Sequence, residues 1–265
     1  MTILDGAMGT MLQASVPEMP KYPETINLTA PEAVTAIQRR YVEAGSEILC
    51  TNTFTCNSRR AKKAGYDLDE VVAAAIGNAR RAGNARVALD VGPLGEFLEP
   101  YGELSEAEAR EIFRALGNAG RAADLFYIET MADLREARIA AEELRAAADK
   151  PVFATFTFAR GGKTMTGASP RDAVREMGDI CAAVGLNCSL GPVEALPLVR
   201  EFAEHSPVPV IAKPNAGMPD SAGHYSMSPA AFAAAAKELR AAGAAYIGGC
   251  CGTTPDFIAA LRDIR

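Results

Sequence analysis

The chain has 265 residues and a mass of 27.9 kDa, which is the usual size of one (β/α)8 barrel. Its composition, 49% hydrophobic and 23% charged, excludes a disordered, collagenous or coiled-coil chain. The net charge is −6 without a long run of Lys or Arg, so we expect no nucleic-acid partner. Since no apolar stretch could span a membrane and no leader-like segment begins the chain, we expect a soluble, cytoplasmic protein without a membrane partner.

Short apolar runs rich in β-branched residues alternate with longer runs of helical period. In chain order, the predicted strands are 2–5, 48–53, 86–91, 125–129, 152–158, 183–188, 209–213 and 245–249. The predicted helices are 31–43, 68–82, 106–118, 133–148, 170–181, 193–204, 229–241 and 255–264. Serine or threonine before a proline marks three of the helix starts, at Ser169, Ser228 and Thr254.

Eight strands that alternate with eight helices most simply close into a single (β/α)8 TIM barrel over residues 1–265, and an open doubly wound sheet is the alternative. No linker or domain boundary interrupts the pattern. The longest connection, 6–30, follows the first predicted strand. In a barrel, loops after strands carry the functional site, so the residues at strand ends are the candidates for chemistry.

Three of the six cysteines stand at predicted strand ends: Cys188 after the sixth strand, and Cys250 and Cys251 after the eighth. Neighbouring residues of a strand point to opposite faces, so the two adjacent cysteines converge only if the strand breaks, which Gly248, Gly249 and Gly252 permit. Three thiolates without a fourth leave one position open, as in a catalytic zinc site. Inert core thiols or a vicinal disulfide are the alternatives.

The other polar residues at the same rim have a functional and a structural interpretation. Asp5 and Glu129 could bind an ammonium group or transfer protons, or could form a turn and a helix cap. Asn52 could bind substrate or its own loop. For Cys50, Cys56 and Cys181 we expect structural roles. No nucleotide-binding glycine motif is present, and His205 and His224 belong to no evident catalytic set.

The sequence resembles the homocysteine S-methyltransferase family, and within it the homocysteine-binding domain of the cobalamin-dependent methionine synthases. The motifs that carry the resemblance run from the first strand to the last helix. They are I-L-D-G-A-M-G-T (3–10), T-N-T-F (51–54), D-V-G-P-L-G (90–95), L-E-P-Y-G (98–102), I-E-T-M-A-D (128–133), G-L-N-C-S-L-G-P (185–192), P-N-A-G (214–217) and G-G-C-C-G-T-T-P (248–255).

The resemblance implies a zinc ion on Cys188, Cys250 and Cys251, with the thiol of homocysteine in the open position. It also implies that Asp5, Gly6 and Glu129 hold the amino-acid end of the substrate, and that Asn215 is a weak fourth ligand which substrate displaces. Lys213 departs from the family, which usually has an aromatic residue there, and Cys50 replaces a residue that is often acidic.

Three functions follow for testing. The first is methyl transfer to homocysteine, giving methionine, from a methylcorrinoid protein on a separate chain or from a small donor such as S-methylmethionine or betaine. The region 19–28 and the L-E-P-Y-G motif favour the cobalamin-linked branch. The second is a Schiff-base lyase or aldolase that uses Lys213. The third is a non-catalytic barrel in which zinc only stabilises the fold.

Overall fold

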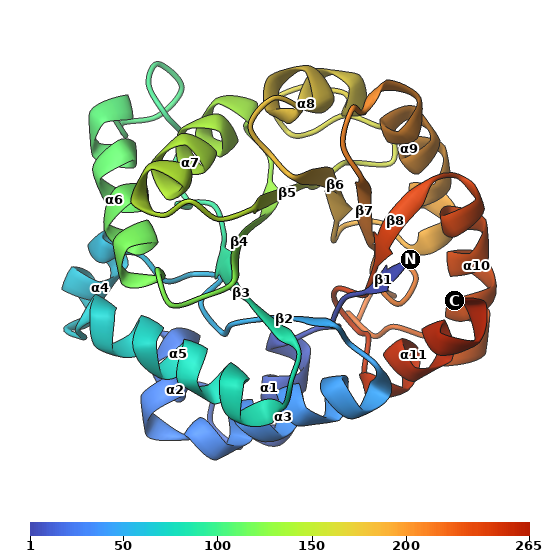
Figure 1. The fold of residues 1–265 in the computed structure, drawn as a ribbon, viewed down its shortest axis with the longest axis horizontal. Helices are drawn as coiled ribbons and strands as arrows, with labels where there is room; N and C mark the ends of the chain where they lie inside the picture. Colours follow the sequence, from blue (N-terminus) through green and yellow to red (C-terminus); the bar gives the residue numbers. More distant parts are fainter.

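Eight parallel strands form a ring in the computed structural model, which describes residues 1–265 (Figure 1). The strands are β1 (Thr2–Ile3), β2 (Ile48–Cys50), β3 (Arg86–Val91), β4 (Leu125–Met131), β5 (Val152–Phe156), β6 (Ala183–Asn187), β7 (Val210–Lys213) and β8 (Ala244–Ile247). From β2 to β8 each strand pairs with the next one in sequence, and β1 pairs with β8. A parallel bridge between Leu4 and Ile48 joins the remaining edges. The (β/α)8 barrel is therefore confirmed, and the open doubly wound sheet is excluded.

Helices surround this ring (Figure 1). Those that follow the strands are α3 (Pro31–Ala44), α5 (Leu68–Ala82), α6 (Glu106–Ala119), α7 (Leu134–Ala147), α8 (Pro170–Met177), α9 (Pro192–His205), α10 (Pro229–Ala241) and α11 (Pro255–Ala260). Short additional elements are α1 (Gly9–Ser15), η1 (Pro23–Thr25), α2 (Ile26–Thr29), α4 (Ser58–Ala64) and η2 (Leu261–Ile264). Three of these, α1, η1 and α2, lie in the connection 6–30, so this connection is largely helical.

The element boundaries correct several predicted ends. The predicted strands 48–53, 152–158 and 245–249 run too far, because residues at the rim leave the hydrogen-bonded ladder to build loops. The predicted helix 170–181 is also too long, since α8 ends at Met177 before Gly178. Of the predicted caps, Ser169 and Ser228 accept backbone N–H groups, whereas Thr254 makes no side-chain cap.

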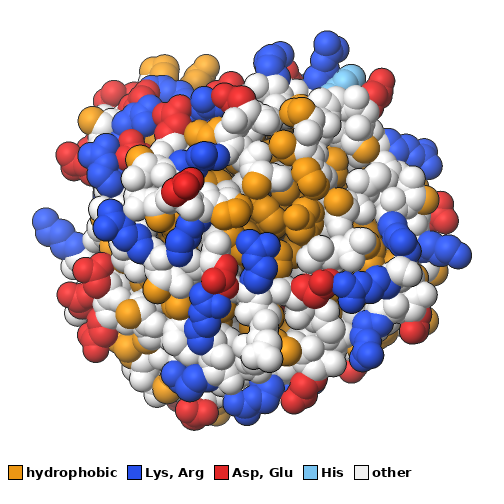
Figure 2. Space-filling view, in the orientation of Figure 1, with side chains coloured by type: hydrophobic (Ala, Val, Ile, Leu, Met, Phe, Trp, Pro, Cys, Tyr) orange, Lys and Arg blue, Asp and Glu red, His pale blue; other side chains and the backbone are white.

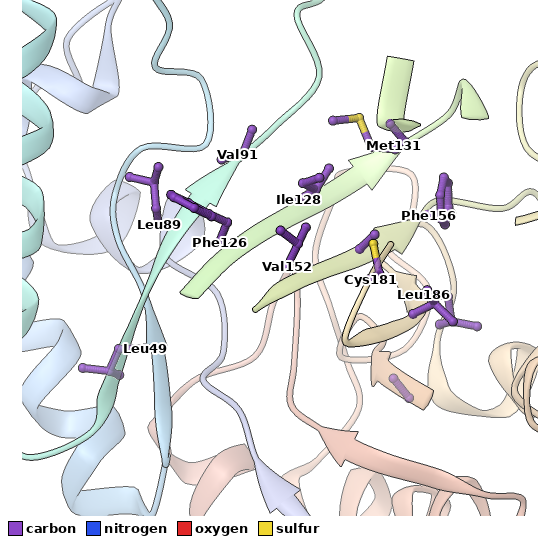
Figure 3. Packing of buried hydrophobic residues seen from close by; sticks show 14 of the residues in the cluster. Leu49, Leu89, Val91, Phe126, Ile128, Met131, Val152, Phe156, Cys181 and Leu186 are labelled. Atoms are coloured by element: carbon purple, nitrogen blue, oxygen red, sulfur yellow. The ribbon is translucent and has the colours of Figure 1, made fainter. Parts of the chain in front are cut away.

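Two apolar layers follow from the alternation of side chains along each strand. One layer packs the outer face of the strands against the helices, and Figure 3 shows its members Leu89, Phe126 and Phe156 on neighbouring strands. The other fills the interior of the barrel and includes Tyr127 and Phe153, whose ring centroids are 6.2 Å apart. Because this interior layer is packed, a ligand has room only at the end of the barrel where the strands terminate.

The surface is mixed in character. On the face drawn in Figure 2, Lys, Arg, Asp and Glu side chains alternate around the periphery, and apolar side chains gather near the middle. None of the helices combines the length and apolar character that crossing a membrane requires.

Candidate metal and substrate site

Cys188, Cys250 and Cys251 come together at the C-terminal end of the barrel. Their three sulfur atoms all lie within 4.8 Å of one another, and the Sγ atoms of Cys188 and Cys251 are 3.8 Å apart. All three are free thiols and are half-buried, so neither a vicinal disulfide nor an inert core position describes them. The convergence predicted from the sequence is confirmed.

Local backbone geometry places these thiols. The strand β8 ends at Ile247, and the backbone N–H of Cys250 then donates to the carbonyl of Pro214 at 2.9 Å. Gly249 allows this path, since a Cβ there would lie 2.4 Å from Oγ1 of Thr253. Cys188 follows β6 in the left-handed region, with φ of 59°. A non-glycine residue in this region costs about 1–3 kcal/mol, and such strain persists where surrounding contacts fix it, as at a functional site.

Asn187, the last residue of β6, connects the cysteine cluster to β4. Its Oδ1 accepts the backbone N–H of Thr130 at 2.8 Å, and its Nδ2 donates to Oγ1 of Thr130 at 2.7 Å. The same Nδ2 lies 3.9 Å from Sγ of Cys250. Thr130 has a φ of 62°. Asn187 therefore fixes the strained residue that follows Glu129, and it orients the glutamate as well as a thiol.

The electrostatics of the three thiols fit a cation. Hydrogen bonds from Cys188 and Cys250 lower the pKa of the Cys251 thiol, whereas the close sulfur of Cys188 raises the pKa of Cys250 well above its usual range. Three neighbouring thiolates thus repel one another unless a positive charge lies between them. Three thiolates with an open fourth position are the donor set of a catalytic zinc site. Asn215 is buried, and its Oδ1 has no hydrogen-bond partner.

A cavity of about 330 Å³ adjoins the three cysteines. It also contains every residue for which the sequence predicts substrate binding: Asp5, Gly6, Asn52 and Glu129. The structure brings these residues together, and their roles in binding stay predictions. The side chain of Asn52 donates to the carbonyl of Pro23 at 3.0 Å, so it also holds the loop after β1. At Gly6 a Cβ would lie 2.8 Å from Oγ1 of Thr253, which explains the glycine.

The two carboxylates of the cavity differ in their partners. Asp5 accepts the backbone N–H of Cys50 at 2.6 Å through Oδ2, and Nζ of Lys213 at 2.8 Å through Oδ1. Oε2 of Glu129 lies 3.8 Å from the same Nζ, is buried and has no hydrogen bond. Burial raises the pKa of Glu129, although the charge of Lys213 opposes this shift. Burial also raises the pKa of Asp90, a third carboxyl group that lines the cavity.

Sequence reasoning underestimated three cavity residues, Cys50, Asp90 and Lys213. The thiol of Cys50, for which a structural role is expected, is buried in the barrel interior, 3.8 Å from Nζ of Lys213. All three stand near strand ends, which is the signal that could have identified them. Burial disfavours the charge of Lys213, but Asp5 and the neighbouring acidic groups raise its pKa well above the usual range. A Schiff-base lysine needs a lowered pKa, so the lyase alternative loses support.

Three convergent thiols at the mouth of a closed (β/α)8 barrel define the class of barrel whose donor set can hold a soft metal ion with one position open. A family model described as Homocysteine S-methyltransferase matches residues 2–265. The chain belongs to this family, and it is an enzyme of the homocysteine S-methyltransferase type.

Two curated relatives are the methionine synthases of Mycobacterium tuberculosis and Mycobacterium leprae, each 32% identical to this chain. The alignments cover 98% and 96% of this chain but 24% and 23% of those proteins, so the chain spans about a quarter of their length.

Among solved structures, the oxidized form of the homocysteine methyltransferase MmuM from Escherichia coli is 25% identical, with a TM-score of 0.84. Its metallated form is 24% identical, with a TM-score of 0.86. Both matches cover 100% of this chain and 96% of the other.

Proposed function

We propose that this barrel transfers a methyl group to the thiol of L-homocysteine, giving methionine, with a zinc ion held by Cys188, Cys250 and Cys251. The observation that carries the proposal is the position of the three thiols at the edge of a cavity that also contains Asp5 and Glu129. A free thiol with a pKa of about 8.5 is mostly protonated at pH 7, and only the thiolate attacks well. A zinc ion held by these three cysteines would supply the charge that ionises the substrate thiol.

The side chains of the cavity then have distinct tasks. Glu129 offers a buried oxygen to the substrate ammonium. Asn187 fixes the positions of Glu129 and Cys250 relative to each other, through its contacts with Thr130 and with the Cys250 sulfur. The packed layer inside the barrel limits the depth of the cavity, and the thiol end of the substrate is placed at the three cysteines because they lie at the cavity edge. Transfer to a thiolate needs no general acid when the donor leaves without a proton. This is consistent with two histidines, His205 and His224, that are exposed and lie outside the cavity.

For the methyl donor we propose a methylcorrinoid protein on a separate chain, so that a cobalamin cofactor reaches the barrel on a partner. The support is the 32% identity to methionine synthases, of which this barrel corresponds to one part. A small donor such as S-methylmethionine or betaine is the second candidate. It is favoured by the likeness to MmuM, because that homocysteine methyltransferase is matched over 96% of its chain by this barrel alone.

The test is a methyl-transfer assay with zinc-loaded protein, L-homocysteine and four separate donors: methylcobalamin, a methylated corrinoid protein, S-methylmethionine and betaine. We expect methionine from methylcobalamin or the corrinoid protein. Methionine from the small donors alone would replace the corrinoid proposal by the second candidate. If no donor gives methionine, the assignment of homocysteine as acceptor is wrong.

A further inference from the structure

Lys213 places a positive charge inside the substrate cavity. It is the last residue of β7, is 3% exposed and lines the cavity beside Asp5, Cys50 and Glu129. Its Nζ lies 5.2 Å from the centroid of the Tyr127 ring, in a cation–π contact that stabilises the positive charge. Side chains on β2 and β4, together with Asp5 just after β1, therefore surround one buried ammonium group.

The hydrogen-bonding capacity of this ammonium group is only partly used. Lysine has three N–H donors. One oxygen lies within hydrogen-bond distance, Oδ1 of Asp5 at 2.8 Å. The sulfur of Cys50, at 3.8 Å, is a weak acceptor, and Oε2 of Glu129, also at 3.8 Å, lies beyond a normal hydrogen bond. Lys213 thus retains a donor for a ligand in the cavity.

The neighbouring carboxylates are in opposite situations. Asp5 uses one oxygen for Lys213 and the other for the backbone N–H of Cys50. Glu129, by contrast, has a buried oxygen without any donor. Lys213 and Glu129 therefore form a long ion pair, 3.8 Å apart, in which the ammonium group and the carboxylate oxygen both retain hydrogen-bonding capacity.

The head group of an α-amino acid complements this pair, because its carboxylate and its ammonium are attached to one carbon atom. We propose that Lys213 binds the α-carboxylate of the thiol substrate, beside the ammonium that the proposed function assigns to Glu129, while Asp5 serves as the counter-ion of Lys213. The proposal rests on the proposed function, since it assigns the amino-acid end of the same substrate. It makes Lys213 a specificity-determining residue that selects thiols with a carboxylate.

Three thiols distinguish the carboxylate contact of Lys213 from the ammonium contact of Glu129. They are L-homocysteine, 3-mercaptopropylamine, which lacks the carboxylate, and 4-mercaptobutyrate, which lacks the amine. Their affinities are measured by titration calorimetry on zinc-loaded protein, and KM and kcat are measured where a donor supports turnover. In the unmodified protein, loss of the carboxylate should weaken binding about 10- to 100-fold, as expected for a charge-assisted hydrogen bond.

The substitution K213M should weaken the binding of L-homocysteine and of 4-mercaptobutyrate by a similar factor. The affinity for 3-mercaptopropylamine should stay within about threefold of that of the unmodified protein. The KM should rise while kcat changes little. Since K213M leaves Asp5 buried without its partner, the double variant D5N/K213M removes both charges and provides a second measurement. The same pattern is expected for it.

If K213M weakened the binding of all three thiols equally, Lys213 would have a purely structural role and the proposal would be overturned. An unchanged affinity of K213M for L-homocysteine would overturn it as well. The calorimetry does not depend on methyl transfer. Protein that binds L-homocysteine with the predicted selectivity but yields no methionine with any donor would retain the Lys213 proposal and refute the methyltransferase function.

Discussion

Asn187 offers a direct test of how the fold positions the site. In N187A, the two hydrogen bonds to Thr130, at 2.8 and 2.7 Å, are lost, and the N–H group of Thr130 loses its acceptor. These two part-buried hydrogen bonds contribute about 2–3 kcal/mol together. With an unfolding entropy of about 2.1 cal/mol/K per residue, a chain of 265 residues should lose roughly 4–5 °C in Tm.

The same substitution should impair substrate binding, because the two bonds to Asn187 support the left-handed backbone of Thr130, which directly follows Glu129. A displacement of about 1 Å at a reacting group can cost 100-fold, so we expect KM for homocysteine to rise at least tenfold. Calorimetric unfolding and steady-state kinetics measure both effects. The matched control is N118A, since Asn118 is exposed and bonds only Arg121, at 2.7 Å. If N187A keeps both the Tm and the KM of the unmodified protein, the positioning argument is refuted.

Three further predictions concern the metal and the substrate. C250A should bind zinc about 100- to 1000-fold more weakly and lose activity, because each ligand contributes roughly 3–4 kcal/mol of metal affinity, whereas C181A should keep its zinc stoichiometry. Equal zinc in both variants would contradict the ligand assignment. E129Q should raise KM for homocysteine about tenfold or more, with a smaller change in kcat, and an unaltered KM would remove Glu129 from the site. Chelation should abolish activity, restored by zinc, with little change in circular dichroism, because 59 residues of apolar core hold the barrel; unfolding would instead indicate a structural metal.

The fold was predictable because its information is local and repeated. Eight alternations of β-branched and helical segments define a barrel, and serine before proline located the starts of α8 and α10. The three cysteines were also predictable, since the carboxyl ends of all strands meet at one rim. The family resemblance then indicated which chemistry this rim performs.

Other features of the site depend on contacts between distant segments and leave no local pattern. Nothing in the sequence around Lys213 indicates that its ammonium group pairs with Asp5, 208 residues away. The hydrogen bond between Asn187 and Thr130 joins residues 57 positions apart in the sequence, so it could not be inferred either. The short helices α1, α2 and α4 were missed because segments of four to seven residues carry too few turns for a periodic signal.

The central claim is that Cys188, Cys250 and Cys251 hold a zinc ion whose open position accepts the substrate thiol. X-ray absorption at the zinc edge, with and without L-homocysteine, measures this directly. The account predicts three sulfur neighbours at about 2.3 Å and one lighter donor in the free protein, and four sulfur neighbours after substrate is added. A shell that keeps three sulfurs at saturating homocysteine would contradict it.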